Sequence, residues 1–273
     1  MQTVSILGCG WLGLPLAKQL IQEGYAVKGS TTTPDKLPVL QAAGIDARLV
    51  QLNPEPAGDL TALLDTDILI VDIPPKAGKF GDDFHPEQIR HLAQAVGQSA
   101  VQRVIYISST SVYPELNREV FETDVVLAEQ SAAPALVTAE QTWLTMPGDR
   151  LVTVLRCGGL MGYERIPGKY VAGKTVSTGD VPVNYIHRDD AAGIITALLR
   201  TSLTGTFNVV APIHPTRREV YEKSCTDLQV AMPSFTESAE PISFKLVSNQ
   251  KLTNQLLYTY QYANPLNFFY SLP

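Results

Sequence analysis

The residues with the clearest chemical potential are three glycines near the start of the sequence. Gly8, Gly10 and Gly13 follow a short apolar run in the spacing G-x-G-x-x-G. Between a strand and a helix, the first glycine permits a tight turn, the second lets a diphosphate approach the backbone, and the third lets the helix pack closely. Unpaired N–H groups at the helix start then attract phosphate. The spacing predicts a dinucleotide site, with Trp11 and Leu12 as further contacts; the alternative is a glycine-rich turn that binds something else.

The residues after the second predicted strand (25–30) bear on which dinucleotide is bound. An acid at this point would bind the ribose 2′-hydroxyl of NAD, but Ser30, Thr31 and Thr32 stand there instead. These hydroxyls and nearby Lys36 could receive the 2′-phosphate of NADP, so NADP is preferred over NAD. The arginine usual for NADP is also missing, and the same residues could simply form a polar loop that caps the next helix.

The elements that must position the glycine turn alternate between strands and helices. Strands are predicted from apolar, β-branched runs at 3–7, 25–30, 47–52, 67–73, 103–108, 151–156, 181–187 and 205–210. Helical spacing of apolar residues or flanking Pro and Gly signals predict helices at 12–21, 34–44, 83–97, 134–144 and 188–200. Alternation of this kind requires crossover connections. The predicted fold class is therefore α/β, with a doubly wound parallel sheet.

The pattern of the sequence changes in two segments, which predicts a second, smaller unit. Residues 1–160 and 180–211 are assigned to a nucleotide-binding domain. The glycine-rich segment 161–179 and the tail 212–273 are assigned to a small C-terminal lobe. The end of the tail is rich in aromatic residues, which would form the core of this lobe or, if exposed, the surface of a homodimer.

Composition restricts the class of protein. The chain has 273 residues, of which 45% are hydrophobic and 18% charged, as in ordinary globular proteins. The formal net charge of -6 argues against nucleic acid or an anionic membrane as a partner and leaves a small-molecule substrate. Three widely spaced cysteines suggest no disulfide framework and fit the cytoplasm. We also expect no signal peptide or membrane span, and no metal site, because His85 and His91 are six residues apart.

Five further stretches, taken in order with the glycine turn, resemble the extended short-chain dehydrogenase/reductase superfamily of NAD-dependent epimerases and dehydratases. They are YISSTSVYP (106–114), AEQTWL (139–144), VLRCGGLMG (154–162), VNYIHRDDAA (183–192) and GTFNVV (205–210). The resemblance covers nearly the whole chain. It implies a Rossmann domain with a small C-terminal substrate lobe, and a cofactor lying across the carboxyl ends of the strands.

The resemblance also implies individual site residues. Ser109 falls where the family has its catalytic serine or threonine. Tyr113, four residues later, is a second catalytic candidate, which either reaches the substrate or packs in the loop. The positions implied to contact the cofactor, beyond the glycine turn and the second strand, are Asn53, Ile73, Pro74, Ser108, Cys157, Gly158 and Gly159.

The sequence departs from the family at its catalytic pair. Typical members carry Tyr-x-x-x-Lys on the helix after the fifth strand, where the lysine lowers the pKa of the tyrosine. Aligned on Glu140, these positions hold Ala132 and Leu136, which cannot transfer a proton. A Tyr-x-x-x-Lys string does occur at 170–174, but it follows the sixth strand, and its Gly173 is better explained as the end of a short helix.

These departures, together with glycines spaced differently from the family's usual G-x-x-G-x-x-G, indicate an atypical member. The predicted function is an NAD(P)-binding oxidoreductase or epimerase that acts on a sugar nucleotide or a similar hydroxyl or carbonyl compound. Ser109 would bind the reacting oxygen, and Tyr113, Tyr163 or a water would move the proton. The alternatives are a cofactor-binding sensor or regulatory protein without turnover, and a scaffold with a vestigial turn. Arg156 could bind a phosphate or carboxylate, or pair with a buried acid.

Overall fold

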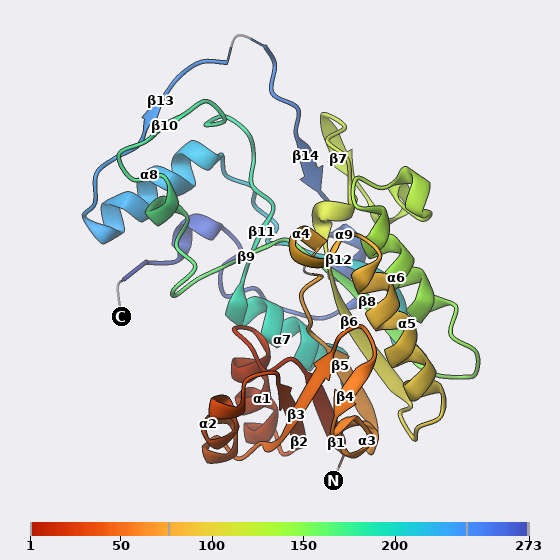
Figure 1. Ribbon diagram of the computed structural model, residues 1–273. Helices are drawn as coiled ribbons and strands as arrows, with labels where there is room; N and C mark the ends of the chain where they lie inside the picture. The colour runs from red at the N-terminus through yellow and green to blue at the C-terminus, as the bar shows by residue number, and fades with distance from the viewer. Residues whose placement is uncertain (1, 76, 239, 272–273) are drawn as a thin grey trace.

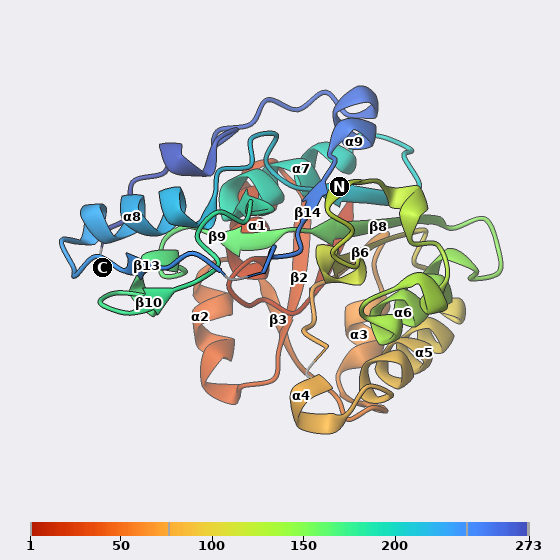
Figure 2. The ribbon, with the colours of Figure 1, turned by 90° about the horizontal axis from the view of Figure 1, so that it is seen from above.

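An eight-stranded sheet forms the centre of the molecule (Figures 1 and 2). The computed structural model describes residues 2–75, 77–238 and 240–271. Along the sheet the strands follow the order β12-β8-β6-β5-β1-β2-β3-β4. Their bounds are β1 Thr3–Leu7, β2 Ala26–Thr31, β3 Asp46–Leu52, β4 Pro56–Gly58, β5 Ile68–Val71, β6 Arg103–Ser109, β8 Leu151–Cys157 and β12 Gly205–Val209.

The sheet is parallel apart from its last strand, which confirms the predicted α/β fold class. Among the described strands of this sheet, β4 alone pairs antiparallel, against β3, and this strand was not predicted. The four residues of β5 are all buried, as expected for a central parallel strand covered on both faces. Strand order reverses between β1 and β5, so the loops after these two strands diverge and leave a crevice at the carboxyl edge of the sheet.

Helices cover both faces of the sheet and make a three-layer fold (Figure 2). Buried apolar residues of α1, α2, α7 and α9 pack on one face, and those of α3, α5 and α6 on the other. The bounds are α1 Gly13–Gln22, α2 Leu37–Ala42, α3 Leu60–Leu64, α5 Phe84–Gly97, α6 Pro134–Leu144, α7 Arg188–Leu198 and α9 Gln250–Gln255.

The helix that starts in the glycine turn is fixed by its apolar face. On α1, Leu16, Ala17 and Leu20 are fully buried at helical spacing. This face holds the helix against the sheet, and its first turn therefore lies at the carboxyl end of β1. The helix contacts α7, which covers the same face further along the sheet.

Smaller elements form the region outside the sheet. Helix α8 (Arg217–Leu228) lies there, and three short parallel pairs join β7 (Arg118–Val120) to β14 (Lys245–Val247), β9 (Gly159–Met161) to β11 (Tyr185–His187), and β10 (Thr175–Val176) to β13 (Ser234–Phe235). The strand predicted at 181–187 is wrong in its first half, since only β11 forms. The segment predicted as a loop after Cys157 contains β9. Both form by pairing with each other, which local sequence does not reveal.

Part of the aromatic tail is buried in a core, which is one of the two alternatives predicted from the sequence. Phe268 and Tyr270 are buried with Met161 and Ile166, whereas Phe269 is exposed. None of the helices in the described ranges combines the length and hydrophobicity that a membrane crossing requires.

Candidate functional site

The three glycines of the turn meet three different environments. Gly8 has φ +110°, and a Cβ there would lie 2.1 Å from the carbonyl oxygen of Asp72. A Cβ on Gly13 would lie 2.2 Å from the carbonyl oxygen of Gly8. A Cβ on Gly10 would meet nothing within 4 Å. Gly8 and Gly13 are thus required by the protein's own packing, while Gly10 keeps open space next to the turn, as a site for a diphosphate needs.

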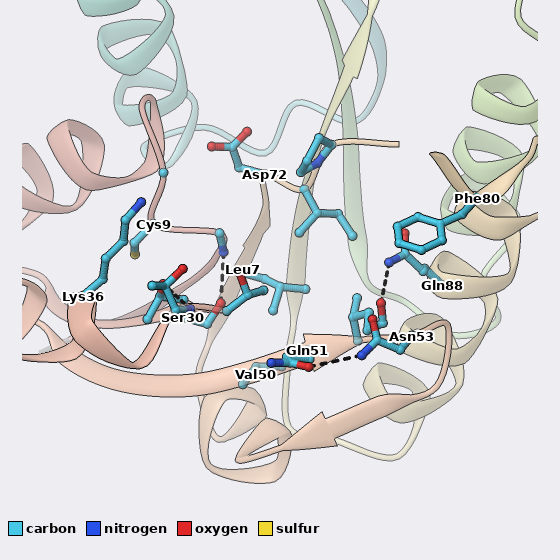
Figure 3. Close-up of a pocket in the computed structure, with 18 of the residues that line it drawn as sticks. Leu7, Cys9, Ser30, Lys36, Val50, Gln51, Asn53, Asp72, Phe80 and Gln88 are labelled. Atoms are coloured by element: carbon cyan, nitrogen blue, oxygen red, sulfur yellow. Dashed lines mark hydrogen bonds between the residues drawn. The ribbon is translucent and has the colours of Figure 1, made fainter. Parts of the chain in front are cut away.

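A cavity of about 480 Å³, called here the first cavity, opens beside this turn (Figure 3). It lies at the carboxyl ends of β1, β2, β3 and β5, which is the edge expected for a ligand of a doubly wound sheet. Its walls include most of the predicted cofactor contacts: Gly8, Gly10, Ser30, Thr31, Thr32, Lys36, Asn53, Ile73 and Pro74.

The hydroxyls at the end of β2 divide into two kinds. The Ser30 hydroxyl accepts a hydrogen bond from the Gly8 N–H at 3.0 Å, and the Thr31 hydroxyl accepts one from the Thr33 N–H at 3.1 Å. Both side chains are buried and support the loop. Thr32 and Lys36 are exposed on the cavity wall. A ligand in the cavity could therefore contact Thr32 and Lys36 without displacing the hydrogen bonds that Ser30 and Thr31 make.

The opposite wall of the first cavity is aromatic and amide-rich. Figure 3 shows Phe80, on α4 (Ala77–Phe80), across the cavity from Lys36. Phe80 stacks on Phe84 with ring centroids 4.4 Å apart. The Asn53 amide donates to Gln51 Oε1 at 3.1 Å. A flat apolar face beside amide donors and acceptors suits a nucleobase.

Asp72 also lines the first cavity, and sequence analysis missed it. Burial raises the pKa of the Asp72 carboxyl to about 6, although the Arg165 guanidinium and the backbone N–H of Gly13 act in the opposite direction. The signal was present, because an acid directly after a wholly apolar strand lies at the carboxyl edge of the sheet. A carboxylate here would oppose the binding of an anion at the glycine turn unless a cation lies nearby.

A second cavity, of about 330 Å³, lies next to the end of β6. Because β6 neighbours β5 in the sheet, this cavity lies further along the same carboxyl edge. Ser109 lines it, and its hydroxyl accepts from the Ser111 N–H at 3.1 Å, which leaves its proton to donate elsewhere. The other lining residues are Thr110, Ser111, Glu115, Val181, Pro182, Val183, Asn184, Tyr185, Arg217, Tyr221 and Lys245.

Tyr113 does not agree with its predicted catalytic role. The side chain is fully buried, and its hydroxyl donates to Asn208 Oδ1 at 2.6 Å and accepts from Arg156 Nη1 at 2.9 Å. Burial raises its pKa to about 12. Tyr113 packs below the loop, which was the alternative interpretation, and lines neither cavity. Tyr163 lies outside both cavities too, with its hydroxyl donating to Asp189 at 2.6 Å.

Arg156 and Ser108 belong to one buried network. Arg156 Nη2 lies 2.7 Å from Glu140 Oε2, and both side chains are almost fully buried. The Ser108 hydroxyl donates to Glu140 Oε1 at 2.5 Å. Of the two interpretations of Arg156, the buried pair is therefore the one observed. Ser108, predicted to contact the cofactor, instead has its hydroxyl committed to this network.

The remaining predicted contacts line neither of the two cavities. Cys157 and Leu12 are buried. A Cβ on Gly158 would lie 2.4 Å from the Asn184 carbonyl oxygen, and one on Gly159 would lie 2.6 Å from the Tyr185 ring, so both glycines allow close packing. Trp11 is half-buried at the glycine turn and donates from Nε1 to Glu164 Oε2 at 2.8 Å.

Comparison with known proteins identifies the family. The NAD(P)H-binding family profile matches residues 8–202, which begin at the first glycine of the turn. The chain belongs to this NAD(P)H-binding family. Protein YeeZ from Escherichia coli (strain K12) is 35% identical over 270 residues, covering 97% of this chain and 98% of that protein.

Solved structures agree on the fold. The UDP-Glc/GlcNAc 4-epimerase from Campylobacter jejuni superimposes with a TM-score of 0.78 at 14% identity, over 97% of this chain and 96% of that one. UDP-glucuronic acid 4-epimerase from Bacillus cereus, solved with UDP-glucuronic acid and NAD, gives 0.76 at 19% identity over 98% of both chains. The predicted resemblance is confirmed for the NAD(P)H-binding family and for a fold shared with these NAD-dependent epimerases.

Proposed function

We propose that this member of the NAD(P)H-binding family uses its dinucleotide to oxidise, reduce or epimerise a small polar substrate. The observation that carries the proposal is the row of two cavities along one sheet edge, the first at the glycine turn and the second at Ser109. A dinucleotide with its adenosine in the first cavity runs along this edge and directs its nicotinamide to the second. When bound, the nicotinamide supplies or accepts a hydride.

Within the first cavity we assign the adenosine to the wall of Phe80 and Asn53 and its ribose to the end of β2. Thr32 and Lys36 are exposed there, and among the described residues that line the cavity at this strand end there is no acid to bind the 2′-hydroxyl of NAD. A 2′-phosphate would gain the Lys36 charge. These features favour NADP.

Titration with NADPH and with NADH, followed by nicotinamide fluorescence, tests this assignment. We expect both to bind and NADPH to bind more tightly. Lys36→Ala should weaken NADPH roughly tenfold, as expected for one charge-assisted contact, and leave NADH unchanged. Lys18→Ala is the control, because Lys18 is an exposed lysine of α1 that does not line the first cavity. Equal affinities for the two cofactors would contradict the preference for NADP, and no binding of either at millimolar concentration would exclude the whole proposal.

The chemistry of the second cavity favours an anionic substrate with a hydroxyl or carbonyl group, such as a sugar nucleotide. Arg217 lines it and has no ion-pair partner in the ranges the structure describes, whereas neighbouring Arg218 pairs with Asp180 at 3.3 Å. Lys245 is already paired with Glu115 at 3.1 Å. Arg217 is therefore the cation left to bind a phosphate or carboxylate.

Tyr185 takes the place of the missing tyrosine in this proposal. It lines the second cavity with Ser109, and burial raises the pKa of its phenol to about 12. A phenol of this pKa stays protonated at neutral pH and can donate a hydrogen bond to a carbonyl oxygen as the hydride arrives. The Arg217 charge acts against burial and lowers the Tyr185 pKa toward the range that a proton donor needs. Ser109 would donate a hydrogen bond to the same oxygen.

A measurement of turnover distinguishes the proposed enzyme from the alternative, a sensor that binds the cofactor without catalysing a reaction. The sensor is favoured by Leu136, which is buried in an apolar cluster where the family has a lysine. Nicotinamide absorbance is followed with NADP⁺ or NADPH and a panel of sugar nucleotides. We expect turnover that falls at least a hundredfold in Tyr185→Phe and is unchanged in Tyr163→Phe. Cofactor binding without turnover on any substrate would favour the sensor.

A further inference from the structure

Trp11, in the middle of the glycine turn, is covered by two arginines from distant parts of the chain. The Arg165 guanidinium lies 4.2 Å from the centroid of the indole, and that of Arg188 lies 5.0 Å from it. The indole itself is fixed by its hydrogen bond to Glu164. The indole of Trp11 therefore gives the glycine turn an aromatic face on which guanidinium groups stack.

Arg188 is the better enclosed of the two arginines. It begins α7 and also lies 3.9 Å from the centroid of the Tyr163 ring, with its side chain only 16% exposed. The Tyr163 hydroxyl is held in turn by Asp189. With aromatic rings at two sides and its Nε 3.6 Å from Asp189 Oδ1, Arg188 is held within the cluster.

Arg165 differs because its side chain is exposed and has no carboxylate within ion-pair distance in the described part of the chain. Its charge nevertheless acts on Asp72, which lines the first cavity, so the guanidinium lies within electrostatic range of that cavity. One face of the guanidinium rests on the indole, which leaves its N–H edge for another partner. A planar N–H edge matches two phosphate oxygens.

We propose that Arg165 binds the diphosphate of the dinucleotide, with Trp11 holding the guanidinium in position beside the glycine turn. The proposal rests on the proposed function, since it requires a dinucleotide in the first cavity. The N–H groups at the start of α1 bind the diphosphate from the backbone, and Arg165 adds the positive charge that offsets the Asp72 carboxylate. Arg165 is thus a cofactor-binding residue contributed by a segment more than 150 positions from the turn.

The test measures binding of ADP-ribose and NADPH by calorimetry, because ADP-ribose carries the diphosphate without the nicotinamide. Arg165→Gln removes the charge from an exposed side chain, so folding should be unaffected, and thermal unfolding checks this. We expect both ligands to bind about tenfold or more weakly. Arg165→Lys, which keeps the charge without the planar edge, should recover part of the loss. Added salt should weaken wild-type binding more than binding by Arg165→Gln.

Arg200→Gln is the matched control. Arg200 is an exposed arginine paired with Glu23 at the other end of α1, so the same charge is lost far from the turn. Equal affinity and salt dependence in Arg165→Gln and Arg200→Gln would overturn the role of Arg165 alone. Failure of the wild-type protein to bind either ligand would overturn the proposed function and the Arg165 site together.

Discussion

At the scale of single residues, the same amino acid serves packing at one position and ligand space at the next. Gly8 and Gly13 are glycines because a Cβ would collide with backbone oxygens at 2.1 and 2.2 Å. Gly10 is a glycine although nothing in the protein crowds it. The spacing of the three predicts this division of roles, because each glycine of a G-x-G-x-x-G turn answers a different demand of the backbone.

Substitution of these glycines should separate folding from binding. Gly10→Ala should unfold at nearly the wild-type temperature and bind NADPH at least tenfold more weakly, because its methyl group enters the diphosphate space. Gly13→Ala should lose roughly 2 kcal/mol or more of unfolding free energy through overpacking. Denaturant unfolding and NADPH titration measure the two effects. Wild-type affinity in Gly10→Ala would show that no ligand approaches the turn.

Asp72 should make stability depend on pH. Its pKa is raised from an ordinary value of 3.8 to about 6 in the folded protein, so the folded state holds this proton more tightly than the unfolded state. The resulting stabilisation is complete below pH 3.8 and is lost as the pH rises through 6. Relative to wild type, Asp72→Asn should gain up to roughly 3 kcal/mol between pH 4 and pH 7. Parallel unfolding curves of the two proteins across this range would contradict the burial of the carboxyl.

At the scale of elements, local sequence predicted the bounds of an element correctly where its start signal and its apolar face lie within its own residues. Helix α6 begins at Pro134 and ends at Leu144, the predicted bounds, because a proline starts it and apolar residues define its buried face. Strands β9 and β11 form only by pairing with each other across more than 20 residues, and no local pattern encodes that partnership. The two alternatives for Tyr113 could not be separated for the same reason, since Asn208 and Arg156 reach it from other strands.

The network that ties α6 to the sheet predicts a large cost for a small change. Glu140→Gln would leave the buried Arg156 guanidinium without its carboxylate, at a cost of about 3–5 kcal/mol. Glu87→Gln, in the exposed pair of Glu87 with Arg90 at 2.6 Å, should cost less than about 1 kcal/mol. Denaturant unfolding compares the two variants. Equal losses would mean that the Arg156 pair is not the buried anchor of α6.

At the scale of the whole molecule, the proposed cofactor and substrate sites lie along one edge of the sheet. The first cavity, the Arg165–Trp11 contact and the second cavity belong to loops at the carboxyl ends of the strands. The fold and the glycine turn were predictable from sequence. The second cavity was not, because its walls come from Ser109, Tyr185, Arg217 and Lys245, which are brought together only by the complete fold.

The most direct test of the central claim is a crystal structure of the protein with NADPH bound. We predict adenine beside Phe80, the diphosphate between Gly10 and Arg165, and the nicotinamide C4 facing the second cavity within reach of Ser109 and Tyr185. A dinucleotide bound away from the glycine turn, or a nicotinamide that faces only apolar side chains, would contradict the account.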